Sequence, residues 1–137
     1  MSAPRRLTPR IVPPYPIPAA VESEAGTLVA HGAVVDISGC GACLWTDAPL
    51  APGATLCFRL RFVEPEEAHG VVGMVVWSEA ARAPEGRCHR AGVEWLGATR
   101  ACRERLRELA GRAVPPAERE QYLFQAPWRI GDEARGA

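Results

Sequence analysis

Apolar and polar residues alternate in the middle of the chain with the period of two that a half-buried β-strand produces. The clearest case is residues 55–62, where every second position from Leu56 to Phe62 is large and apolar and the positions between are Thr, Cys or Arg. A Pro-Gly turn signal at 52–53 comes just before this segment. Residues 91–95 alternate in the same way, with Ala, Val and Trp on one face. We therefore expect a strand in each segment.

Three further segments extend this β pattern. Residues 28–37 are rich in Val and Ala and end in the turn-forming sequence Ser-Gly-Cys-Gly, after which 42–45 is predicted to be a short strand. Residues 71–77 are nearly all apolar and mostly β-branched, which predicts a strand buried on both faces. Short strands separated by turn signals, from about residue 19 to 96, indicate an antiparallel β-sandwich or a small β-barrel.

The periodicity changes to that of a helix over residues 99–112. Apolar residues there recur three or four positions apart, as on one face of an amphipathic helix. Thr99 is placed to act as the N-cap, and Gly111 with the following prolines ends the helix. We therefore expect one helix after the last strand.

A proline-rich segment precedes the strands. Residues 1–18 contain six prolines, and each proline fixes its own φ and disfavours the helical region for the residue before it. The chain is accordingly divided into an extended arm over 1–18, a barrel-and-helix domain over 19–113 and a C-terminal tail over 114–137.

Composition excludes several classes of protein. The 137 residues suggest one domain, and 47% of them are apolar, which is enough for a packed core. Sixteen basic and sixteen acidic residues cancel, so we expect no general binding of DNA or RNA. The apolar runs are too short for membrane insertion. Five cysteines without a visible secretory signal indicate free thiols and a cytoplasmic protein.

Two short motifs contain the candidate ligand-binding residues. The arm contains RxxxR, extended by one arginine to RRxxxR, and DxSxxG follows at the end of the predicted strand 28–37. The candidate residues are Arg5, Arg6, Arg10, Asp36, Ser38 and Gly41. Together and in this order, the motifs resemble those of the PilZ domain family, the bacterial receptor module for cyclic di-GMP. The resemblance covers about residues 5–112.

The resemblance implies both a fold and a function. The fold is a small, all-β, antiparallel six-stranded barrel with one C-terminal α-helix. The function is that of a cyclic di-GMP-binding receptor or adaptor in bacterial second-messenger signalling, which acts on a downstream protein partner and is not an enzyme. By resemblance, Arg6 and Arg10 clasp base and phosphate, and Asp36, Ser38 and Gly41 surround one guanine.

The chemistry of these residue types suits the same ligand. A guanidinium can bond guanine O6 and N7, pair with phosphate or stack on a purine. The Asp36 carboxylate can accept from guanine N1–H and N2–H, and Gly41 lets the backbone approach closely or adopt a φ that other residues resist. Because nothing in the sequence ties the arm down, we expect it to be mobile when free and ordered when ligand is bound.

Two other interpretations remain open. The first is a PilZ-like protein-interaction module that does not bind nucleotide, in which Asp36 and Ser38 only stabilise a turn. The second is a zinc protein, in which the CxxC at Cys40 and Cys43 is completed by Cys88 and its neighbouring histidine. We predict that no metal is bound, because a zinc knuckle would occupy the turn that the ligand needs. No pattern of catalytic residues is visible, and we expect Trp77 and Trp95 to lie in the core.

Overall fold

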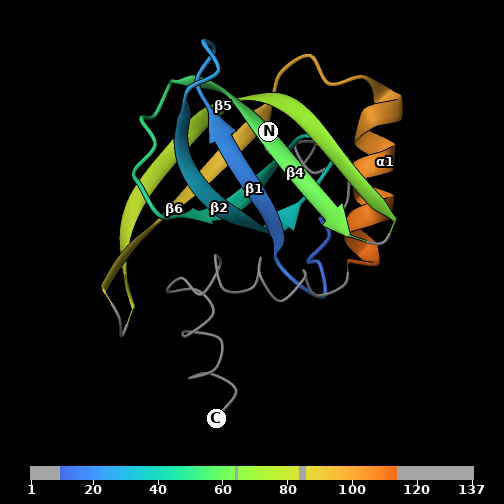
Figure 1. The fold of residues 1–137 in the computed structure, drawn as a ribbon, viewed down its shortest axis with the longest axis horizontal. Helices are drawn as coiled ribbons and strands as arrows, with labels where there is room; N and C mark the ends of the chain where they lie inside the picture. The colour runs from blue at the N-terminus through green and yellow to red at the C-terminus, as the bar shows by residue number, and fades with distance from the viewer. Residues whose placement is uncertain (1–9, 64, 84–85, 114–137) are drawn as a thin grey trace, which may run out of the picture.

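The computed structural model describes residues 10–63, 65–83 and 86–113, and it shows a six-stranded antiparallel barrel followed by one helix (Figure 1). The elements are β1 (Ile17–Glu22), β2 (Leu28–Ile37), β3 (Gly41–Thr46), β4 (Thr55–Val63), β5 (Glu66–Ala83), β6 (Gly86–Trp95) and α1 (Arg100–Gly111). Neighbouring strands pair in the order β1-β2-β3-β6-β5-β4, and β4 closes the barrel by pairing with β1. The predicted fold class is confirmed.

Three strands differ from the sequence prediction. β1 was not predicted as a strand, and it begins at Ile17, inside the segment that we assigned to the arm. β6 begins at Gly86, five residues before the predicted segment 91–95. β5 is much longer than the predicted 71–77, and it is not buried on both faces: Val71 is 3% exposed, whereas Val72 is 45% exposed. The prediction was wrong because each strand of a closed barrel has one face toward solvent. An apolar run by itself does not show which face is covered.

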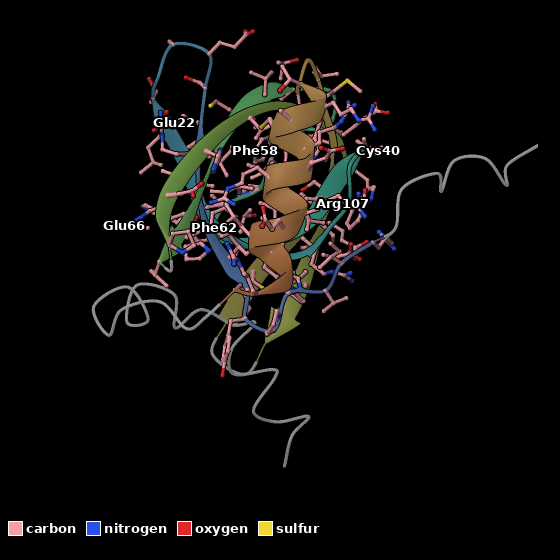
Figure 2. All side chains as sticks on the ribbon, turned by 90° about the vertical axis from the view of Figure 1, so that its right-hand side faces the viewer. Glu22, Cys40, Phe58, Phe62, Glu66 and Arg107 are labelled. Carbon is pink, nitrogen blue, oxygen red and sulfur yellow. The ribbon has the colours of Figure 1, made fainter. Side chains whose placement is uncertain are left out.

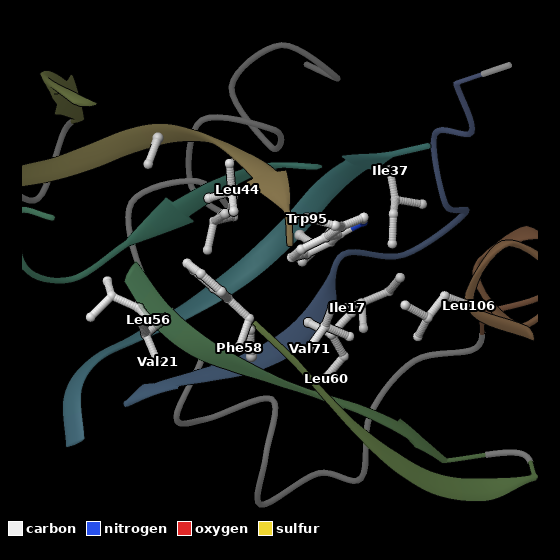
Figure 3. Packing of buried hydrophobic residues seen from close by; sticks show 14 of the residues in the cluster. Ile17, Val21, Ile37, Leu44, Leu56, Phe58, Leu60, Val71, Trp95 and Leu106 are labelled. Carbon is white, nitrogen blue, oxygen red and sulfur yellow. The ribbon is translucent and has the colours of Figure 1, made fainter. Parts of the chain in front are cut away.

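The barrel interior is filled by the inward-facing residues of all six strands. Phe58 and Trp95 meet edge to face, with ring centroids 5.9 Å apart (Figure 3). The buried residues of α1 join the same apolar cluster, so the helix packs against one end of the barrel. Thr99 is its N-cap as predicted, because the Thr99 hydroxyl accepts a hydrogen bond of 3.1 Å from the Cys102 backbone N–H. Figure 2, in which α1 faces the viewer, shows Phe58 and Phe62 to the left of the helix.

A salt bridge joins the β4–β5 hairpin to α1. The Glu67 carboxylate accepts hydrogen bonds from the Arg105 guanidinium, including Nε at 3.2 Å, and lies 2.8 Å from Nε2 of His69. Hydrogen bonding to Arg105, and to a smaller extent to His69, lowers the pKa of Glu67 to about 2. The hydrogen bond between Arg105 and Glu67 also raises the pKa of Arg105.

No helix among the described residues is long and apolar enough to cross a membrane.

The salt bridge between Glu67 and Arg105 predicts an acid-sensitive contribution to stability. The pKa of Glu67 in the folded protein lies below its ordinary value of 4.5, so the stabilisation is complete above pH 4.5 and is lost as pH falls toward 2. Glu67→Gln should lower the melting temperature by a few degrees at neutral pH, and the difference from wild type should shrink below pH 4.5. Thermal unfolding monitored by circular dichroism measures this, with exposed Glu66→Gln as the control. A difference that is independent of pH would contradict the prediction.

Candidate ligand-binding groove

The second motif forms the turn between β2 and β3. Asp36 lies at the end of β2, directly after a register shift in the β2–β3 pairing, and Gly41 is the first residue of β3. The Ser38 backbone N–H donates to the Gly41 carbonyl at 2.8 Å, and the Ser38 hydroxyl accepts from the Cys40 N–H at 3.2 Å. Ser38 therefore shapes this turn through its own hydrogen bonds, and Asp36 is held beside it.

Arg10, the first residue that the structure describes, lies against Asp36. Its Nε is 3.3 Å from the Asp36 carboxylate, and the two side chains are 49% and 22% exposed. The next residue, Ile11, forms an antiparallel bridge with Ile37, with backbone hydrogen bonds of 2.7 and 2.9 Å. The expectation of an arm that is free without ligand is therefore wrong at these two residues. Sequence reasoning missed the backbone bridge because it has no side-chain signature.

The other two arginines of the arm, Arg5 and Arg6, lie outside the described residues, as does the tail over 114–137. Of the six predicted ligand-binding residues, the structure brings four together at one edge of the barrel: Arg10, Asp36, Ser38 and Gly41. The first motif is therefore represented at this site by its second arginine.

Gly41 is needed for packing between strands. A Cβ atom at this position would lie 2.0 Å from the backbone carbonyl oxygen of Val93 in β6, a distance that no carbon side chain can occupy. The φ of Gly41 is not in the left-handed region, since the glycines with positive φ among the described residues are Gly26, Gly53 and Gly97. The expected close approach exists, and its partner is the neighbouring strand.

A groove of about 580 Å³ begins at these motif residues and crosses the outer face of β3, β6 and β5. Its far wall is formed by Val76 and Trp77 of β5, and its floor includes Gly92 and Val93 of β6. A volume in this range can bury a ligand of drug or dinucleotide size. The groove thus offers one cation, Arg10, and two carboxylates, Asp36 and Glu94, at the motif end and an aromatic ring at the other.

Trp77 is the groove residue that the sequence prediction misplaced. It was expected in the core, but it is 39% exposed and its indole lies close against Gly92, where a Cβ atom would be 2.1 Å from the indole Nε1. The register of β5 with β6 shifts between Val75 and Trp77, and a bulge of this kind turns a side chain to the other face. Gly92 within the predicted strand 91–95 was the sequence signal available for this contact, because a glycine inside a strand indicates close approach of another group.

Arg90 of β6 holds two tryptophans in place. Its guanidinium carbon lies 5.3 Å from the ring centroid of Trp45 and 5.8 Å from that of Trp77, which is within cation–π range. Its Nη1 is also 3.7 Å from the Glu79 carboxylate. The Arg90 guanidinium thus lies over the Trp77 ring, and the missing side chain of Gly92 leaves room for the indole.

A smaller cleft adds positive charge beside the motif turn. It has a volume of about 410 Å³ and lies between Gly39 and the α1 residues Arg100, Arg103 and Arg107. Arg100 is paired with Glu104 at 3.1 Å. Figure 2 shows Cys40 of the turn and Arg107 of the helix on the same side of the molecule. An anionic ligand that approaches the turn therefore meets a local excess of guanidinium groups.

The cysteines show no metal-ligating arrangement within the described ranges. No group of three or more His, Cys, Asp or Glu residues there could hold a metal ion, and no disulfide joins any of the five cysteines, all of which lie in those ranges. Cys40 and Cys43 line the groove separately, and Cys88 is fully buried, where burial raises the pKa of its thiol.

Comparison with known proteins agrees with this architecture. The family model described as PilZ domain matches residues 4–112. The PilZ domain of YcgR from Escherichia coli with c-di-GMP superposes with a TM-score of 0.61 at 12% identity, over 96% of this chain and 95% of that one. MrkH of K. pneumonia in its apo state gives 0.60 at 16% identity, over 92% of this chain and 51% of that one. No curated protein sequence matches. With the barrel, the helix and the family match over most of its length, the chain belongs to the PilZ domain family.

Proposed function

We propose that this protein is a receptor or adaptor for cyclic di-GMP and that the ligand binds in the groove between Arg10 and Trp77. The observation that supports this proposal is the convergence of Arg10, Asp36, Ser38 and Gly41 on one groove that also contains the partly exposed Trp77. Cyclic di-GMP carries two phosphates and two guanines, so its receptor needs cations, a carboxylate that reads the guanine edge and flat stacking surfaces.

Each groove residue has a distinct role in this proposal. The Asp36 carboxylate accepts from N1–H and N2–H of a guanine, the edge at which guanine differs from adenine. The Arg10 guanidinium pairs with a phosphate or stacks on the base, as a planar fork of donors allows. Trp77 presents a half-exposed ring for stacking. Arg5 and Arg6 supply the remaining cations from the arm.

The ion pair between Arg10 and Asp36 suggests how the ligand alters the protein. The Arg10 guanidinium and the Asp36 carboxylate lie 3.3 Å apart, so a guanine that bonds to Asp36 must displace Arg10. The ligand thus replaces the ion pair between Arg10 and Asp36 with its own contacts. It also moves the part of the arm that adjoins Ile11. The resulting change of surface at the arm is what a downstream protein partner recognises, without any catalytic step.

The same ion pair favours one competing function. A groove in which Arg10 and Asp36 already form an ion pair also fits a PilZ domain that binds only proteins and no nucleotide.

Isothermal titration calorimetry with cyclic di-GMP distinguishes the receptor from the protein-binding module, with GMP and cyclic di-AMP as controls. We expect selective binding at micromolar strength or tighter, about −8 kcal/mol. The absence of heat at high protein concentration, or equal binding of cyclic di-AMP, would reject the receptor function.

A further inference from the structure

The hairpin formed by β5 and β6 extends beyond the barrel and exposes one edge of β5. The pairing of β4 with β5 ends at the pair formed by Thr55 and Met74. Backbone hydrogen bonds from the loop before β4 reach β5 no farther along than Val75. From Trp77 to Ala83, β5 pairs with β6 alone among the described residues. Figure 1 shows this ribbon projecting from the barrel at the lower left. One side of β5 therefore offers backbone N–H and C=O groups for a further strand.

The open edge lacks the features that usually prevent strands from pairing. Proteins protect such edges with lysines, prolines or inward-pointing charges. The chain contains no lysine at any position, and between Val76 and Ala81 there is also no proline. The charged residues of the edge are Arg82 near its end and Glu79, which is 3.7 Å from Arg90 of the same hairpin. The side chains of Ser78 and Ala80 are small, and Val76 is 54% exposed. An approaching strand therefore meets accessible backbone and an apolar contact.

We propose that a second copy of this chain pairs with this edge, β5 against β5 in antiparallel orientation about a two-fold axis. Such pairing makes one segment its own complement. With Ser78 on the axis, Glu79 of each copy stands opposite Trp77 of the other and not opposite a second Glu79, and Ala80 stands opposite Val76. The chain has a net charge of zero, so two copies do not repel each other at long range.

The short edge implies a weak dimer. Stable dimers bury roughly 800 Å² per partner, and a single short strand edge covers far less than that. We therefore expect a dissociation constant of about 0.1–1 mM, in the range of weak and transient contacts.

Sedimentation equilibrium across about 10 μM to 1 mM tests the proposal. The mass should rise from the 14.8 kDa of one chain by about half or more at the highest concentration. Ala80→Lys places a charge opposite Val76 and should keep the protein monomeric throughout. Ala25→Lys, in the exposed turn between β1 and β2, should behave like wild type. A wild-type protein that is monomeric at the highest concentration, or dimers that Ala80→Lys leaves unchanged, would overturn the proposal.

A second measurement needs no variant. Amide NMR signals of Val76–Ala81 should shift on dilution, whereas those of the remaining barrel strands should stay constant. Shifts confined to another surface would also overturn the proposal. Val76 and Trp77 also line the groove, so the dimer and the ligand share part of a surface, but the sedimentation and NMR measurements use no ligand. Ala80 does not line the groove, so at about 10 μM, where both proteins are monomers, Ala80→Lys should bind cyclic di-GMP like wild type.

Discussion

Arg10→Ala should weaken cyclic di-GMP binding by a factor of about 100 or more, because it removes charge-assisted hydrogen bonds that are each worth about 1.5–3 kcal/mol. It also removes the guanidinium that lies 3.3 Å from the Asp36 carboxylate. Arg10→Lys should lose nearly as much affinity, since a compact ammonium group reproduces neither the planar fork nor the stacking surface of a guanidinium. Calorimetric titration of the three proteins measures both effects.

Arg59 offers a closely matched control for this experiment. Its guanidinium lies 3.3 Å from Glu22 with side chains 51% and 25% exposed, almost the same geometry and exposure as the pair between Arg10 and Asp36. Arg59 does not line the groove, so Arg59→Ala removes one exposed ion pair and one positive charge but no ligand contact. We expect its affinity to stay within about twofold of wild type, because a distant surface charge is largely screened. Equal losses in Arg10→Ala and Arg59→Ala would show that only overall charge matters.

Gly41→Ala should destabilise the protein by about 2–3 kcal/mol, the cost of forcing extra atoms into a packed interior. The added Cβ would lie 2.0 Å from the Val93 carbonyl oxygen, and that oxygen belongs to the backbone of a paired strand and cannot rotate away. β3 and β6 must therefore separate at the point where both line the groove. Urea unfolding gives the stability, and titration on the folded fraction should show weaker binding as well.

Gly70 separates this effect from a general cost of replacing glycine in a strand. A Cβ atom at Gly70 of β5 would lie 3.5 Å from the Cys57 sulfur, an ordinary van der Waals contact. Gly70→Ala should leave stability unchanged or raise it slightly, because alanine loses less backbone entropy on folding than glycine does. If Gly41→Ala were as stable as Gly70→Ala, the proposed packing role of Gly41 would be wrong.

Several features of this protein follow from local sequence alone. The alternation from Leu56 to Phe62 specifies which face of β4 is buried, and the N-cap at Thr99 specifies where α1 begins. These predictions succeed because the responsible interactions lie within one strand or one helical turn. The two motifs also indicated the family, which the match over residues 4–112 confirms.

The arrangement of the groove depended on contacts between distant segments. Trp77 faces solvent because of a register shift against β6, and Gly41 is required by a carbonyl group of Val93. Arg10 meets Asp36 because Ile11 pairs with the end of β2. Backbone pairing, bulges and the closure of the barrel leave no mark on any single short segment, since they arise from how strands align with one another. The sequence by itself therefore determined the positions of five of the six strands, the helix and the motifs, whereas only the tertiary structure decided where β1 lies and which side chains share the groove.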